Sequence, residues 1–126
     1  MIDVPKQIEY WRTGSDEDFA AAQSLLEKGH LRHSLFFTHL AIEKMLKAHV
    51  TRQTKDIPPR MHNLVRLAKL AQLNLDPHQL EFLREFNVYQ MEGRYPDDKP
   101  VSIDLGLTRK EIMESEKILV WLKMQL

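Results

Sequence analysis

Apolar and small residues recur at helical spacing along most of this sequence. Near the N-terminus the positions that would share one face are three or four residues apart: Ile8, Trp11, Ser15, Phe19, Ala22 and Leu26. This spacing is typical of one face of an α-helix, and it predicts a helix over residues 5–28. Leu occurs 18 times, more often than Val and Ile together, and there are only 4 Gly. Both features favour helices over strands.

The second predicted helix covers residues 31–53. Its main stripe consists of Leu31, Leu35, Thr38, Ile42, Met45 and His49, and further apolar residues widen the surface beyond that stripe. Such a helix has neighbours on more than one side, so we expect it at the centre of the fold. Gly14 and the polar run that follows it allow a kink in the first helix. Pro58 and Pro59 indicate a loop after the second helix.

Three further segments complete the predicted fold. A short helix begins near His62 and Asn63, and a longer one runs from Asp76 to about Glu92, with Asp76 as N-cap. Residues 94–107 have no sustained period and predict a long loop, a type of segment that is often functional. The last helix begins at Thr108. The sequence therefore predicts a single all-α domain over residues 1–126, an up-and-down bundle of four long helices and one short helix.

Composition excludes several classes of function. Lys and Arg together number 18, as do Asp and Glu, so overall charge does not favour nucleic acid or anionic membranes. The absence of Cys excludes disulfides, Cys-zinc sites, Fe–S clusters and Cys nucleophiles. Glycine-rich phosphate loops are absent. No apolar run approaches the length of a membrane span, and residues 1–5 lack signal-peptide features. We expect a cytoplasmic protein.

A few polar residues are candidates for a functional site. His39 and Glu43 share a helix face but supply only two groups, so we expect no metal site and no cofactor. Lys44 and Lys47 form either a solvated face or a small anion-binding patch. Residues 89–98 hold two Tyr, one Arg and three acids. Arg94 could lock this segment to the end of a helix, or could bind phosphate beside a base-stacking Tyr.

Four segments, in order, resemble the HEPN-domain family, whose name stands for higher eukaryote and prokaryote nucleotide binding. These segments are Trp11 with Asp18, Phe19 and Ala22; residues 40–48, which resemble the family's AxEKxLKA signature; His62-Asn63-Leu64; and Arg94-Tyr95-Pro96-Asp97. The resemblance implies a helical bundle that commonly dimerises. It also implies a small protein often encoded beside a minimal nucleotidyltransferase, in toxin–antitoxin-like pairs.

Many members of that family are metal-independent ribonucleases with an Arg and a following His that are separated by four to six residues. In the corresponding region Arg84 is present, but Tyr89 and Gln90 stand where the His would be needed. Without an imidazole the usual acid–base group is missing. Arg32 and His39 satisfy the spacing but lie on the second helix, outside the family's location. This departure from the family's pattern counts against nuclease activity, and a ribonuclease would need a non-standard pair of residues.

Three functions follow as alternatives. The chain binds a nucleotide or a partner nucleotidyltransferase, or it is a ribonuclease toxin with a degenerate motif, or it is a structural adaptor without catalysis. We expect a homodimer, because the second helix is apolar on more faces than one small bundle can cover. The predicted ligand-binding residues, taken from both the residue pattern and the resemblance, are Arg94, Tyr95, Asp97, Lys44, Lys47 and His62.

Overall fold

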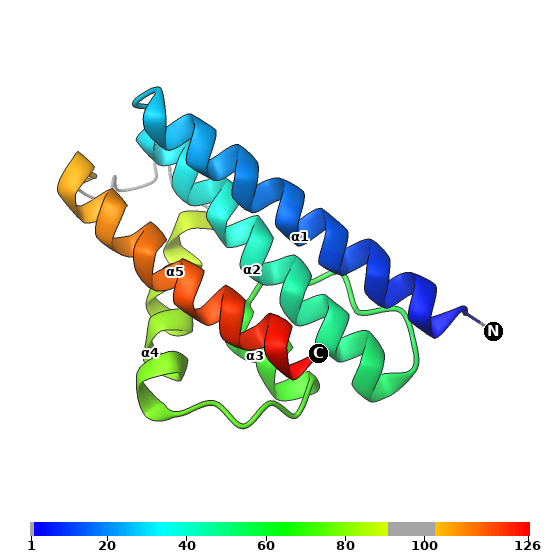
Figure 1. Ribbon diagram of the computed structural model, residues 1–126. Coiled ribbons are helices and arrows are strands. Elements are labelled where there is room, and N and C mark those ends of the chain that lie inside the picture. Colours follow the sequence, from blue (N-terminus) through cyan, green and yellow to red (C-terminus); the bar gives the residue numbers. More distant parts are fainter. Residues whose placement is uncertain (1, 91–102) are drawn as a thin grey trace.

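The computed structural model describes residues 2–90 and 103–126. These residues form the helices α1 (Val4–Glu27), α2 (Leu31–Thr54), α3 (Leu64–Leu70), α4 (Pro77–Phe86) and α5 (Leu105–Gln125), with a 3₁₀ turn, η1 (Asn87–Gln90), after α4. The two longest helices, α1 and α2, lie side by side along the molecule, and α5 runs along α2 (Figure 1). The predicted all-α bundle is confirmed.

Helix α1 continues without a break through Gly14, where the sequence allowed a kink. The Ser15 hydroxyl, one residue later, donates to the Ala41 carbonyl of α2 at 2.6 Å, which holds the two helices together at this point. A Cβ at Gly14 would lie 3.1 Å from Cδ of Lys44. The glycine therefore gives the Lys44 side chain room to pass α1 and does not end the helix.

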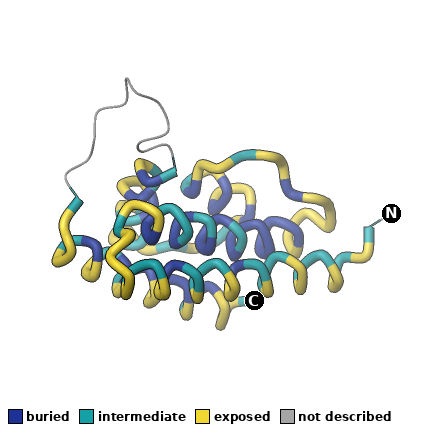
Figure 2. Tube along the Cα trace, turned by 90° about the horizontal axis from the view of Figure 1, so that it is seen from above, coloured by how far each residue is buried: buried dark blue, intermediate teal, exposed yellow. Residues whose placement is uncertain are grey.

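Helix α2 is the centre of the fold. It contacts α1, α3, α5 and η1, and its buried residues outnumber those of any other described helix. Figure 2 shows buried segments in the interior of the molecule, with exposed ones around them. The sequence predicted this central place. The apolar faces of α2 are covered within one chain, however, so they no longer provide the reason for expecting a dimer.

The boundaries of the last two helices differ from the prediction. Regular α-helix ends at Phe86 and continues as η1, whereas the sequence predicted α-helix to about Glu92. The predicted N-cap Asp76 is confirmed, and the structure shows that it forms a capping box with Gln79. Helix α5 begins three residues earlier than Thr108, because Asp104 is the N-cap and accepts a hydrogen bond from the Leu107 amide at 2.7 Å. Residues 105–107 are therefore helical and do not belong to the predicted loop.

The C-terminal end of α5 is tied to α2 by hydrogen bonds between residues far apart in sequence. His49 Nε2 donates to the Leu122 carbonyl at 2.7 Å. Arg52 Nη1 donates to the carbonyls of Gln125 at 2.7 Å and Leu126 at 2.8 Å. Burial lowers the pKa of His49, and its bond to Leu122 opposes that effect. Among the described helices, none combines the length and apolarity that crossing a bilayer requires.

Candidate functional site

A buried carboxylate on α2 gathers the polar residues of the candidate site. Glu43 is 4% exposed. Its carboxylate accepts a hydrogen bond from Lys47 Nζ at 3.0 Å, one turn along the same helix. It also accepts from His62 Nδ1 at 3.1 Å and 3.2 Å. Because an ionised carboxylate only accepts hydrogen bonds, it fixes a proton on Nδ1 and leaves Nε2 as the other edge of the ring.

Lys47 is enclosed together with Glu43. Its side chain is 8% exposed, and Nζ lies 5.3 Å from the centre of the Trp11 ring on α1. The ammonium is therefore neutralised by a carboxylate and faces the aromatic ring. A buried cation of this kind maintains the α1–α2 contact, and its side chain offers little surface to a ligand.

His62 is the accessible member of the cluster, with a side chain that is 52% exposed. It precedes Asn63, the N-cap of α3, whose side chain accepts from the Arg66 amide. Asn87 of η1 accepts from the Leu64 amide at 2.9 Å. These bonds fix the backbone on the C-terminal side of His62, while Glu43 fixes its ring. The imidazole is therefore held in one orientation at the surface.

His39 is the fully buried member. Its ring stacks on Phe86 with centroids 6.5 Å apart and planes 10° from parallel, and Nδ1 lies 3.7 Å from Glu43 Oε1. Neither ring nitrogen makes a well-formed hydrogen bond with a described residue. Burial lowers the pKa of His39 to about 4, outweighing the carboxylate of Glu43 and the side chain of Asn87, which raise it. His39 is neutral at pH 7.

The lowered pKa of His39 predicts a loss of stability in acid. The unfolded chain takes up a proton near pH 6.5, while the folded chain does so only near pH 4. Stability therefore falls as pH decreases from about 6.5 to about 4, by about 3 kcal/mol for this residue. Urea unfolding of wild type and His39→Leu across pH 4–8 should show a smaller pH dependence in the variant. Identical pH profiles would contradict this interpretation.

The structure brings together only some of the residues that the sequence selected. Lys47 and His62 meet at Glu43. Lys44 follows Glu43 directly on α2 but does not join this cluster, because it pairs with Asp18 of α1 at 2.8 Å. The remaining predicted site residues, Arg94, Tyr95 and Asp97, lie outside the described residues. The sequence indicated the His39–Glu43 pair but not the contribution of His62 to it, since 19 residues separate His62 from Glu43.

The Arg and His residues that fit the ribonuclease spacing are not arranged as a pair. His39 has no exposed surface, whereas Arg32 is exposed near the start of α2. Arg84 is exposed on α4 and donates to Glu81 at 2.6 Å. A substrate at the surface would not reach the His39 ring. Within residues 2–90 and 103–126, no three His, Asp or Glu side chains are placed to hold a metal ion.

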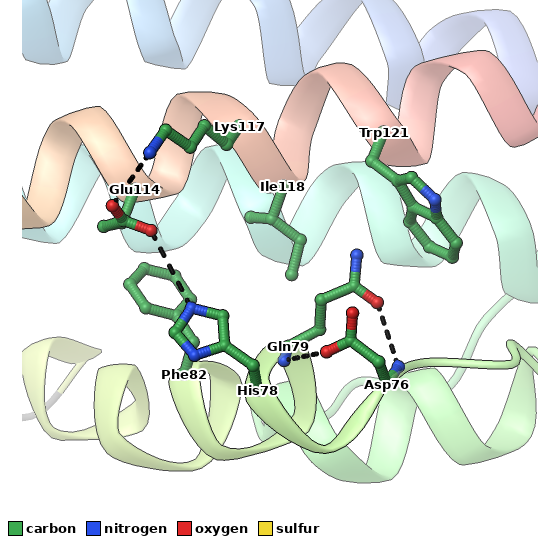
Figure 3. Close-up of a pocket in the computed structure, with 8 residues that line it drawn as sticks. All are labelled: Asp76, His78, Gln79, Phe82, Glu114, Lys117, Ile118 and Trp121. Carbon is green, nitrogen blue, oxygen red and sulfur yellow. Dashed lines mark hydrogen bonds and ion pairs between the residues drawn. The ribbon is translucent and has the colours of Figure 1, made fainter.

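A pocket that the sequence did not predict lies between α4 and α5. Its volume is about 390 Å³. As Figure 3 shows, Phe82, Ile118 and Trp121 line it. Glu114 pairs with Lys117 on the same helix at 3.1 Å and reaches across to His78 of α4 at 3.9 Å. The only signal in the sequence was a pair of aromatic residues on amphipathic helices. That signal does not distinguish a groove from a core.

Comparison with known proteins agrees with this architecture. The profile of the HEPN domain matches residues 8–125. The crystal structure of TT1696 from Thermus thermophilus superposes with a TM-score of 0.80, at 20% identity, over 95% of this chain and 98% of that one. ST0689, an archaeal HEPN homologue, has a TM-score of 0.72 at 21% identity, over 94% and 96% of the two chains. No curated protein matches the sequence significantly.

Proposed function

Because this chain belongs to the HEPN-domain family, we propose that it is a helical-bundle binding protein whose partner is a nucleotidyltransferase-like protein, the two acting as a toxin–antitoxin-like pair. One observation carries the proposal: the exposed His62 imidazole is held in one orientation by the buried carboxylate of Glu43 at 3.1 Å. A recognition group fixed before binding loses little conformational entropy when a partner docks. The proposal includes a cytoplasmic homodimer.

The pairing of both lysines favours a protein partner over a nucleotide. Phosphate recognition requires cations that are free to turn toward the ligand. Lys47 is buried against Glu43, and Lys44 is held by Asp18 at 2.8 Å. The chain as a whole has no net charge. A protein surface can use the directed His62 ring without an excess of positive charge, so the nucleotide is the second candidate ligand.

His62→Ala tests the binding function. The variant keeps the Glu43–Lys47 pair, so its unfolding free energy should change by about 1 kcal/mol or less, as is usual for a partly exposed hydrogen bond. Tagged wild type should retain a nucleotidyltransferase from a lysate of the native host. The amount retained by the variant should be at least tenfold smaller. His33→Ala, at an exposed residue of α2, is the matched control.

Two other results would contradict the proposal. Equal recovery of the nucleotidyltransferase with wild type and with His62→Ala would show that His62 is not part of the interface. Saturable binding of ATP by wild type, measured by calorimetry and lost in His62→Ala, would favour the nucleotide as ligand if no partner protein is retained.

The same geometry supports a catalytic function as the alternative. An imidazole with Nδ1 bonded to a carboxylate and Nε2 facing solvent is the usual arrangement of a general base. In a ribonuclease this role would then belong to His62, since His39 is buried and neutral. Cleavage of RNA by highly purified wild type but not by His62→Ala, with activity retained in His33→Ala, would favour the enzyme over the binding protein.

A further inference from the structure

The outward face of α5 carries an unusual row of exposed apolar side chains. Met113 is 59% exposed, Val120 is 52% exposed and Met124 is 77% exposed. Their spacings of seven and four residues place them in one line along the helix. Exposed apolar side chains are common singly, whereas three in one line along a helix indicate a contact surface. We call these three residues the α5 ridge.

Apolar grooves lie along both sides of the α5 ridge. The groove toward α4 includes Trp121 in its lining (Figure 3). A second hollow of about 220 Å³ separates α5 from α1, and its lining includes Phe19, Met45, Leu119 and Val120. Val120 thus belongs to both the ridge and this hollow. The ridge with a groove on each side has the form of a surface that can receive side chains from a second helix.

We propose that the α5 ridge packs antiparallel against the α5 ridge of a second copy, about a two-fold axis that passes close to Val120. The proposal gives a surface to the homodimer included in the proposed function and rests on it. In this arrangement Met113 of one copy lies opposite Met124 of the other, and the reverse contact occurs by symmetry. The Val120 side chains lie near the axis. One pairing register therefore buries all six exposed side chains of the two ridges.

The charges on the α1-facing edge of the ridge agree with the same register. Glu116 and Lys123 are seven residues apart and lie along the same edge of α5, the edge that faces α1. Asp16 of α1 holds the Lys123 ammonium there at 3.1 Å. The antiparallel arrangement sets Glu116 of each copy near Lys123 of the other, which gives two equivalent contacts between opposite charges. The chain has zero net charge, so two copies approach without overall repulsion.

The oligomeric state of two glutamate variants tests the surface. Light scattering of wild type at tens of micromolar should give twice the 14.9 kDa mass of one chain. Val120→Glu should weaken the dimer at least tenfold, because two charges would meet near the axis. Ile57→Glu, at a residue 58% exposed outside the helices, should leave it unchanged. Circular dichroism of both variants should match that of wild type, since both positions are exposed.

Engineered cysteines test the register. The chain has no Cys, so each introduced thiol is unique. A mixture of Met113→Cys and Met124→Cys chains should form a disulfide-linked dimer under mild oxidation. Neither variant alone should do so, because equivalent positions would lie about 16 Å apart along the helix axis, too far for a disulfide. Cross-linking of Met113→Cys with itself would overturn the antiparallel register.

The proposed dimer and the proposed surface fail in different ways. A wild-type mass of one chain would overturn both. If wild type is a dimer, Val120→Glu is equally dimeric, and Met113→Cys and Met124→Cys chains do not cross-link, the dimer stands and the α5 surface is overturned.

Discussion

Glu43→Leu is expected to lower the free energy of unfolding by about 3–5 kcal/mol. The substitution leaves the Lys47 ammonium buried with no carboxylate, and a charge isolated in this way carries a large desolvation penalty. Both side chains are almost completely enclosed, at 5% exposure for Glu43 and 8% for Lys47. The substitution also removes the acceptor of His62 Nδ1. Urea unfolding at pH 7 measures the change.

A second variant separates charge burial from a general loss of packing. Glu43→Leu combined with Lys47→Met removes both charges and should recover most of the lost stability, as apolar replacements of buried ion pairs commonly do. Glu81→Ala is the matched control, because its ion pair with Arg84 is exposed and should contribute less than about 1 kcal/mol. A Glu43→Leu change as small as that of Glu81→Ala would contradict the buried-pair interpretation.

Phe86→Ala is expected to lower the free energy of unfolding by about 3–5 kcal/mol, the usual range for removing a buried aromatic ring. Phe86 is fully buried and contacts Phe82 with ring centroids 5.2 Å apart and Tyr89 with centroids 4.7 Å apart. It also stacks on His39. The vacated space should admit water to the imidazole, so the pKa of His39 should rise from about 4 toward its ordinary value.

Both effects of Phe86→Ala can be measured on one sample. Denaturant unfolding gives the stability, and an NMR titration of the histidine Cε1 protons gives the pKa of His39. Phe86→Leu should lose less stability and keep the pKa of His39 nearer 4. Tyr10→Ala, at a ring that is 64% exposed, should change neither by much. A stable Phe86→Ala protein would show that this aromatic cluster contributes little to the core.

The fold could be predicted largely from the sequence because helical order is local. Apolar spacing located α1 and α2, and the capping chemistry of Asp76 was sufficient to place the start of α4. The start of α5 was predicted too late, at Thr108, because Thr is a competent N-cap by residue type. In the folded chain Asp104 caps the helix, and the Thr108 hydroxyl donates to the Asp104 carbonyl at 2.7 Å. Local chemistry alone does not choose between them.

The candidate site could be predicted only in part, because its members come from different elements. The spacing of Glu43 and Lys47 predicts that they neighbour each other on one helix. It does not reveal that α1 covers Lys47 with Trp11, or that His62 returns to the same carboxylate. Contacts between residues that are far apart in the sequence depend on the tertiary fold, and so does the burial of Lys47. The α5 ridge was missed for a related reason: an apolar residue on a helix gives no sign in the sequence of whether its own chain covers it.

The bonds that tie α5 to α2 have a consequence for the order of folding. Residues in contact between α1 and α2 belong to neighbouring helices, whereas His49 and Leu122 are 73 positions apart. Closing the longer loop costs more chain entropy, and local contacts form sooner than distant ones. We therefore expect the α1–α2 hairpin to form first and α5 to dock last.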